Sequence, residues 1–321
     1  MKNKFYTFLI LVVLFSMFLM VFIFSKDVAN SVLFSISIWK DNLLPSLFPF
    51  FILSDLLMEY GFIELISFFF GRIMLNLFHL RKETGFALVT SMISGFPSGG
   101  KFTKILLDKN VITLDEANHL IMFTHYSNPI FVVFTIGVFL LNNKKIGFII
   151  LLCHIISNFI IGIIFRRKKQ YFNKKESIFD ILENITDKRL KGKKFITILI
   201  NSIINTFKIL VNMLGIIIFF LIITTLLKKF FVFSPFFNAI FSGIIEMTQG
   251  IIFLSKLNIS IQLKASIIGA LISFGGISVH FQVKSIIDGT KICYKNFLIA
   301  RIIHAILCFV FIYIFLSWFM Y

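Results

Sequence analysis

Cysteine is scarce in this chain, and the motifs by which many enzymes hold a metal or a nucleotide are missing. The three cysteines, Cys153, Cys293 and Cys308, lie in or beside apolar runs and form no Cys-x-x-Cys pair. This spacing argues against a disulfide framework and a cysteine metal site. The chain also has no His-Glu-x-x-His helix, no Ser-His-Asp constellation and no glycine-rich nucleotide loop. We therefore expect no enzyme activity, no cofactor and no bound metal.

Charged residues are also few. They make up only 15% of the chain, whereas 58% is hydrophobic and the mean hydropathy is +0.94. A soluble domain is closer to half apolar, so the composition predicts an all-α polytopic integral membrane protein. At about 20 residues for each span, a chain of 321 residues holds roughly eight spans with their loops.

Acidic residues are the rarer of the two signs, and the formal net charge is +17. Residues 166–194 hold 11 Lys or Arg and four acids, a local balance of 11 − 4 = +7. A basic loop between spans is typical of the cytoplasmic side of a membrane protein, where it lies near anionic lipid. We expect a basic cytoplasmic loop here, with membrane lipid as a partner and no nucleic acid.

The N-terminal apolar run, residues 5–24, follows Lys2 and Lys4. It resembles a signal peptide, but no small-residue cleavage site precedes Lys26. We therefore expect a retained transmembrane anchor within residues 1–34.

The rest of the first half contains interrupted helices. Residues 62–79 carry Arg72, which predicts an interfacial or re-entrant helix. A further helix is expected to begin after Thr113, with Glu116 as its capping partner, and to run to Ser127. The other expected elements are a span over 43–58, a hairpin over 85–107, a resumed helix over 130–141 and a span over 146–165.

The second half is expected to restart at Phe195, with one polar face over 195–206 and a strong span over 207–227. The remaining expected elements are 235–254, 263–274 with 279–287, and 297–319.

The apolar runs are broken at corresponding places in the two halves. The first-half breaks are Ser94–Lys101 and residues 126–129, and the second-half breaks are 246–250 and 274–280. Helix breaks at membrane depth free backbone groups, which are tolerated only where protein or a water-filled cavity satisfies them. Paired breaks of this kind point to a transporter binding site.

The two halves also align as an internal repeat. A shift of 151 positions places Phe123 on Phe274 and Gly99 on Gly250, whereas a shift of 169 places Leu57 on Leu226. We expect two structurally related halves, residues 35–165 and 195–321, in an inverted arrangement. The charge pattern does not determine the direction in which the spans of each half cross the membrane.

The breaks supply the candidate substrate pathway. Half-helix N-termini favour anions, Lys101 adds a positive charge one turn inside, and Ser and Asn supply hydrogen bonds. Simple kinks in packed helices are the alternative explanation of these residues. The candidate pathway residues are Ser94, Pro97, Ser98, Gly99, Gly100, Lys101, Ser127, Asn128, Pro129, Glu246, Thr248, Gln249, Gly275, Gly276, Ser278, His280 and Gln282.

Glu246 is an acid inside a long apolar run, so we expect it to face a cavity or a partner. It could carry a coupling proton, bind a cation or contact the solute; a structural partnership with an Arg or Lys is the alternative. His280 and His125 are candidates for solute contact, whereas His154 and His304 are expected to make interhelical hydrogen bonds.

These break motifs resemble the YlbJ-type sporulation integral membrane proteins. The most specific piece is Gly275-Gly276-Ile277-Ser278-Val279-His280-Phe281-Gln282, and the resemblance covers residues 35–310. It implies two nucleoside-recognition gate domains, so that both repeats are gate-like. One departure is that His125 and Tyr126 stand where the family pattern has two Asn residues.

The resemblance further implies a sporulation transporter or facilitator that moves dipicolinic acid, a small anion, from the mother cell towards the forespore. The implied location is the outer forespore membrane. Alternatives are a nucleoside or ion permease, or a sporulation scaffold that docks other membrane proteins through residues 166–194. Each of the transport functions could use a coupling proton or sodium ion, and each is compatible with a homo-oligomer.

Overall fold

A computed structural model describes residues 2–166, 194–231 and 233–319, and these residues form an all-helical protein without strands. Most of the basic segment 166–194 therefore lies outside the described residues. The first half contains α1 (Lys2–Ile23), α2 (Ser25–Ile38), α3 (Leu44–Glu59), α4 (Phe62–Ile73), α5 (Thr84–Ser94), α6 (Ser98–Asp108), α7 (Leu114–Phe123) and α8 (Lys144–Ile164). Three π-helical stretches, η1 (Trp39–Leu43), η2 (Met74–Phe78) and η3 (Phe131–Leu140), join or extend them.

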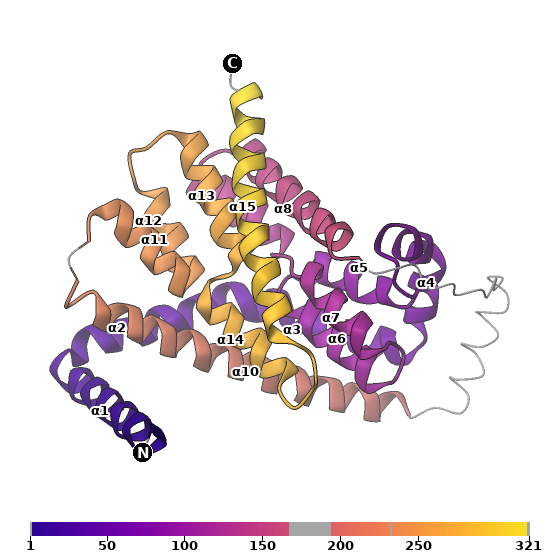
Figure 1. The fold of residues 1–321 in the computed structure, drawn as a ribbon, viewed down its shortest axis with the longest axis horizontal. Coiled ribbons are helices and arrows are strands. Elements are labelled where there is room, and N and C mark those ends of the chain that lie inside the picture. The colour runs from indigo at the N-terminus through magenta and orange to yellow at the C-terminus, as the bar shows by residue number, and fades with distance from the viewer. Residues whose placement is uncertain (1, 167–193, 232, 320–321) are drawn as a thin grey trace.

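The second half begins with α10 (Phe195–Leu227), which joins residues 195–206 and 207–227 in one long helix. It continues through α11 (Pro235–Ile245), α12 (Met247–Ser255), α13 (Ile261–Phe274), α14 (Gly276–Ile287) and α15 (Tyr294–Phe319). Figure 1 shows α2 and α10 side by side along the lower edge, while α15 rises from the centre towards the C-terminus.

Five helical segments in the described part of the chain are long and apolar enough to cross a membrane: Phe5–Ile23, Lys144–Ile164, Phe195–Leu227, Ile261–Ile287 and Tyr294–Trp318. The segment Ile261–Ile287 consists of α13 and α14 together. A sixth arises if α3 and α4, which are bent by 91°, form one broken span. The estimate of about eight came from chain length alone, whereas part of the chain forms helices too short to span. Glu246, for example, divides residues 235–254, which were expected as one element, into α11 and α12. Large apolar side chains remain exposed along α1, α10 and α15, as expected of lipid-facing helices.

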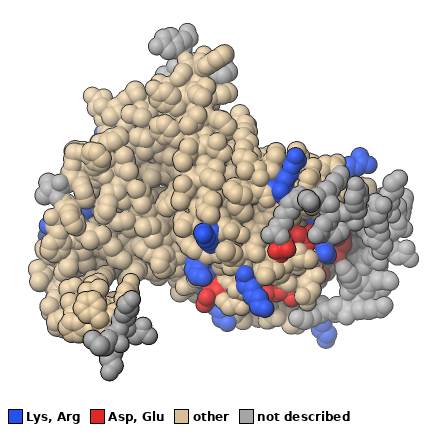
Figure 2. Space-filling model, viewed as in Figure 1, with Lys and Arg blue, Asp and Glu red and all other residues tan. Residues whose placement is uncertain are grey.

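Figure 2 shows one face of the molecule as largely uncharged, with charged side chains gathered towards the end where α6 and α7 lie. This separation agrees with a membrane protein, because charged side chains are costly in hydrocarbon and collect at the aqueous boundary.

Several local predictions are confirmed. Residues 84–108 form the expected hairpin, with α5 and α6 joined at the Gly95–Pro97 corner. Helix α7 begins with the expected capping box, in which the Glu116 N–H bonds the Thr113 hydroxyl and the Glu116 carboxylate accepts the Thr113 N–H. Arg72 lies in the last turn of α4, and because the 91° bend between α3 and α4 fits both a broken span and a re-entrant segment, the interfacial or re-entrant helix stays a prediction.

Corresponding helices in the two halves keep a nearly constant offset. The first hairpin helices α5 and α11 begin 235 − 84 = 151 positions apart and end 245 − 94 = 151 positions apart. Helices α7 and α13 end 274 − 123 = 151 positions apart, and α8 and α15 begin 294 − 144 = 150 positions apart. The same shift that aligned the sequence therefore aligns the helix boundaries.

The two main hydrophobic cores exchange elements between the halves. The core around Phe86, Phe102 and Phe123 also contains Val283 of α14 and Phe297 of α15. The core around Ile268 and Ile312 also contains Val132 and Ile136 of η3, together with Ile150 of α8. The segment after the first break, η3, therefore packs in the core of the second half, and the segment after the second break, α14, packs in the core of the first half.

Close helix contact in the second hairpin depends on Gly250. A Cβ atom there would lie 2.2 Å from the Gly243 Cα atom, whereas a Cβ atom at Gly215 of α10 would have no neighbour within 4 Å. We expect Gly250→Ala to lower the melting temperature of the detergent-solubilised protein, because overpacking costs about 1–3 kcal/mol. Gly215→Ala is the control and should be neutral or stabilising, by up to about 1 kcal/mol of helix propensity. Equal melting temperatures of the two variants would contradict this close packing.

Candidate functional site

The corner of the first hairpin packs against the first break in the chain. Gly95 adopts φ +86°, and a Cβ atom there would lie 2.6 Å from the Asn128 N atom. The Asn128 side chain donates to the Ser94 carbonyl at 3.3 Å, and the Ser94 hydroxyl donates to the Ser98 hydroxyl at 2.7 Å. The small residues of the corner thus allow backbone to meet backbone.

The first break begins four residues earlier than predicted. Helix α7 ends at Phe123, not at Ser127, and residues 124–128 are non-helical. The Ser127 N–H donates to His154 Nε2 at 3.1 Å, and the Asn158 side chain donates to the His125 carbonyl at 2.6 Å. These α8 side chains satisfy backbone groups that a continuous helix would have paired internally.

The second break is narrower than predicted. Gly275, at φ +90°, ends α13, and α14 begins at Gly276 rather than at residue 279. Ser278 and His280 therefore lie inside α14, not ahead of it. A Cβ atom at Gly276 would meet the Met247 N atom at 3.0 Å, so the second hairpin corner packs against this break as the first corner does against its own.

Glu246 is buried and caps a helix. Its carboxylate accepts the Gln249 N–H at 2.9 Å at the start of α12. Across the described ranges it forms no ion pair and lines neither of the two cavities described below. Gln249 accepts from Lys228 at 3.4 Å, and burial lowers the pKa of the Lys228 amine to about 8.

Arg301 of α15 lies at the centre of the breaks and is completely buried. Its guanidinium donates to the Met122 carbonyl at the end of α7, to Asn158 Oδ1 at 3.1 Å and to His304 Nδ1 at 2.7 Å. His304 Nε2 in turn donates to the His154 carbonyl at 2.9 Å, which confirms the predicted interhelical role of both histidines. All these acceptors are neutral, and a helix C-terminus such as that of α7 favours a cation.

Several buried polar atoms at the breaks have no hydrogen-bond partner. They are His125 Nε2, Tyr126 Oη and Ser127 Oγ at the first break, and Ser278 Oγ and Gln282 Oε1 within α14, which follows the second break. His280, by contrast, bonds Tyr294 Oη at 2.8 Å and the Phe274 carbonyl at 3.1 Å. Buried polar atoms are normally paired, so unpaired atoms that gather at one place require an explanation.

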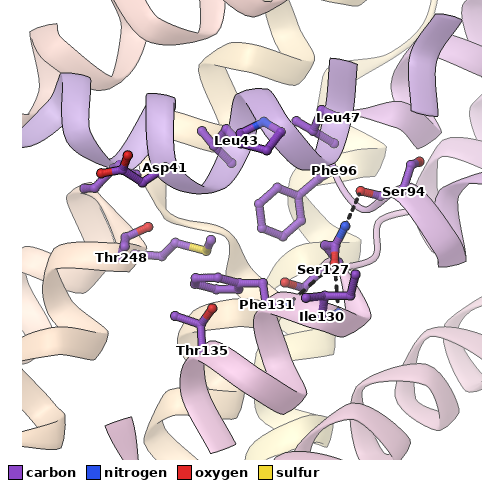
Figure 3. Close-up of a pocket in the computed structure, with 14 residues that line it drawn as sticks. Asp41, Leu43, Leu47, Ser94, Phe96, Ser127, Ile130, Phe131, Thr135 and Thr248 are labelled. Atoms are coloured by element: carbon purple, nitrogen blue, oxygen red, sulfur yellow. Dashed lines mark hydrogen bonds between the residues drawn. The ribbon is translucent and has the colours of Figure 1, made fainter. Parts of the chain in front are cut away.

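A cavity of about 320 Å³, here called the Phe96 cavity, opens at the first break (Figure 3). The Phe96 and Phe131 rings supply aromatic surface, and Ser127, Thr135 and Thr248 supply hydroxyl groups. The predicted residues in its lining are Ser94, Ser127, Asn128 and Thr248, whereas the sequence did not single out Asp41, Phe96, Phe131 and Thr135 as lining residues.

A second cavity of about 440 Å³, here called the Lys101 cavity, lies between α3, α6, α10 and α14. It is lined by two of the candidate pathway residues, Lys101 and Gln282, together with Asp55, Lys104, Asp108, Asn205, Lys208 and Asn212. Lys101 is not free: its ammonium bonds the Asp55 carboxylate at 2.7 Å. Asp55 was not among the candidate pathway residues, and the sequence does not reveal the pairing because it joins residues 46 positions apart.

The predicted site residues thus divide into three groups. Four line the Phe96 cavity, and Lys101 and Gln282 line the Lys101 cavity. The others form the hairpin corners and breaks themselves and line neither cavity; they are Pro97, Ser98, Gly99, Gly100, Pro129, Glu246, Gln249, Gly275, Gly276, Ser278 and His280.

The Arg301 network generates a stability prediction. Arg301→Ala would leave Asn158, His304 and the Met122 carbonyl buried without this donor, and each unsatisfied group costs about 1–3 kcal/mol. We expect a large loss of folded protein after detergent extraction, measured by size-exclusion chromatography. Lys295→Ala, an exposed change on the same helix, is the control. Equal recovery of the two variants would contradict a structural role for the buried guanidinium.

Comparisons with known proteins agree with this architecture. Residues 42–144 match the family model named Gate, described as nucleoside recognition. The sporulation integral membrane protein YlbJ of Bacillus subtilis (strain 168) is 30% identical, and the match covers 86% of this chain and 74% of that protein. No solved structure matches. The chain therefore belongs to the YlbJ family of integral membrane proteins and contains a Gate region in its first half.

Proposed function

We propose that this protein is a membrane transporter or facilitator for a small anionic solute, and that the solute is dipicolinic acid. The observation that carries the proposal is that unpaired buried polar atoms occur near the two helix breaks and that two of their residues line cavities, Ser127 the Phe96 cavity and Gln282 the Lys101 cavity. Such atoms are costly in a sealed membrane core and become useful where a solute passes.

The relation between α8 and α15 supports an inverted repeat. His154 stacks near His304, with ring centroids 4.6 Å apart, and Asn158 bonds Arg301. These two contacts pair rising residue numbers on α8, 154 and then 158, with falling residue numbers on α15, 304 and then 301. The two spans therefore run in opposite directions. At the offset of 151, residue 154 corresponds to 154 + 151 = 305, one position from His304. Corresponding helices thus cross in opposite directions at corresponding residues, as a two-fold axis in the membrane plane would require.

Other contacts repeat in the same reciprocal way. Helix α6 contacts α14, and its counterpart α12 contacts η3; α7 contacts α15, and its counterpart α13 contacts α8. These pairs support residues 35–165 and 195–321 as two inverted gate-like repeats, with residues 1–34 as an anchor. Rocking of one repeat against the other would then alternate access to the breaks.

The two cavities suit different parts of dipicolinate, a flat aromatic dicarboxylate. Lys101, Lys104 and Lys208 give the Lys101 cavity three positive groups against Asp55 and Asp108. The Phe96 cavity offers two aromatic rings and several hydroxyl groups. Volumes of about 320 and 440 Å³ fall within the range of about 300–1,000 Å³ that is usual for small-ligand sites.

A nucleoside is the second candidate solute. The Phe96 cavity has no Lys or Arg in its lining, and its hydroxyl groups, Asn128 and aromatic rings would also suit a neutral base and ribose. The description of the matched family model, nucleoside recognition, favours the same alternative.

The name of the Bacillus subtilis relative places that protein in sporulation. We extend this role to the present chain, in the outer forespore membrane, with transport directed from the mother cell towards the forespore. The protein would work without a cofactor and without catalysis, and a solute gradient or a coupling proton or sodium ion would drive it.

Uptake into vesicles tests the proposal. Proteoliposomes with the purified protein should accumulate labelled dipicolinate above the level of protein-free vesicles, and unlabelled dipicolinate should compete whereas uridine should not. An imposed proton gradient should change the rate if a proton is coupled. Uptake equal to that of protein-free vesicles would refute the proposed function, and competition by uridine alone would favour the nucleoside alternative.

Ser127 gives a sharper test because its hydroxyl lines the Phe96 cavity without a protein partner. We expect Ser127→Ala to leave the melting temperature unchanged but to slow dipicolinate uptake about tenfold, since a hydrogen bond to a charged group contributes about 1.5–3 kcal/mol. The matched control is Ser157→Ala, which removes a buried hydroxyl already bonded to the Cys153 carbonyl. The control should retain uptake, and equal uptake by the two variants would remove Ser127 from the pathway.

A further inference from the structure

The Phe96 and Lys101 cavities lie in succession along one face of α3. Leu47 lines the Phe96 cavity, and Asp55 lines the Lys101 cavity. Between them Phe51 is completely buried and lines neither cavity. The three residues are four positions apart, so they follow one another on the same side of the helix.

An apolar cluster separates the two cavities. Leu47 and Phe51 of α3 pack with Leu210 and Met213 of α10, and all four side chains are at most 2% exposed. We call this cluster the plug. Trp39, just before α3, extends the contact by donating its indole N–H to the Leu210 carbonyl at 2.8 Å.

The Asp55–Lys101 ion pair lies one turn from the plug and joins α3 to α6. The two side chains are 15% and 6% exposed, and the Lys101 ammonium also lies 4.4 Å from the centre of the Phe51 ring. A buried ion pair is strongly destabilised when one partner leaves the other charge unpaired. Asp55 can therefore move away from Lys101 only if another anion takes its place.

A solute carboxylate is suited to that exchange. The Lys101 cavity already brings Lys104 and Lys208 to its lining, which attract an anion. Gln282 faces the same cavity with a buried Oε1 that has no partner, and its side-chain amide can offer N–H donors to a carboxylate. After the exchange Lys101 keeps a negative partner, while Asp55 becomes free to take water in the cavity.

We propose that the Asp55–Lys101 pair is an anion-operated latch: a solute carboxylate displaces Asp55 from Lys101, and α3 then moves to withdraw Phe51 from the plug between the cavities. The latch rests on the proposed transport function and adds to it a basis for selectivity. A neutral nucleoside cannot replace Asp55, so it leaves the plug closed. Asp55 is thus a selectivity residue, and Lys101 is the residue that contacts the solute.

Cysteine labelling of the plug tests the latch in the full-length protein. Leu210→Cys places a reporter in the plug, in a Cys293→Ser background because Cys293 is the exposed native cysteine and Cys153 and Cys308 are buried. A water-soluble thiol reagent should react slowly with this protein. Dipicolinate, which is pyridine-2,6-dicarboxylate, should accelerate the reaction about tenfold. This acceleration takes a change of only about 1.4 kcal/mol in the free-energy difference between the closed and the open plug.

In the Leu210→Cys protein, the added change Asp55→Asn should make the thiol labelling fast even without solute. The matched control is Glu59→Gln, because the Glu59–Lys109 pair joins the same two helices at 2.5 Å but is 41% exposed on both sides, where ion pairs contribute little. The control should react as slowly as the parent. The exchanged pair Asp55→Lys with Lys101→Asp should restore the slow reaction, and Met213→Cys, on the α10 side of the plug, provides a second reporter if Leu210→Cys does not fold.

The outcomes separate the two proposals. Equal rates for Asp55→Asn and Glu59→Gln, in a protein that transports dipicolinate, would overturn the latch and leave the transport function intact. A fast Asp55→Asn protein, together with a parent protein that does not respond to pyridine-2,6-dicarboxylate, would support the latch and count against dipicolinate as the solute. Acceleration by uridine would overturn the requirement for an anion.

Discussion

The structure depends on backbone groups that are released where helices break inside the protein. Each break removes hydrogen bonds that a continuous helix would make, and no lipid can replace them. Side chains from distant helices do so here: His154 accepts the Ser127 N–H, Asn158 donates to the His125 carbonyl, and Arg301 donates to the Met122 carbonyl. The breaks exist only because α8 and α15 meet beside them.

This dependence explains the unusual burial of Arg301. No carboxylate in the described part of the chain pairs with it, and its partners are carbonyl, amide and imidazole acceptors. The negative end of α7 provides part of the missing charge balance. One cation thereby joins the end of a first-half helix to two spans that cross in opposite directions.

Local sequence signals were sufficient for the elements that they control directly. The Thr113–Glu116 capping box, the hairpin corner at Gly95 and the left-handed Gly275 each follow from the residue in place. The end of α7 could not be predicted, because Phe123 is followed by no breaking residue before Pro129 and the break is held by side chains of α8 and α15. Lys101 was expected to add a positive charge near the half-helix end, but its pairing with Asp55 could not be predicted, because nothing near Lys101 in the sequence indicates Asp55.

The exchange of elements between the two cores has a consequence for how the protein is made. The first core needs Val283 and Phe297, which are synthesised long after Phe86 and Phe102. The second core in turn takes in η3 from the earlier part of the chain. A nascent chain that has emerged only as far as α8 therefore has no complete core in which to settle. Its short helices therefore lack part of their packing partners until the last spans have been synthesised.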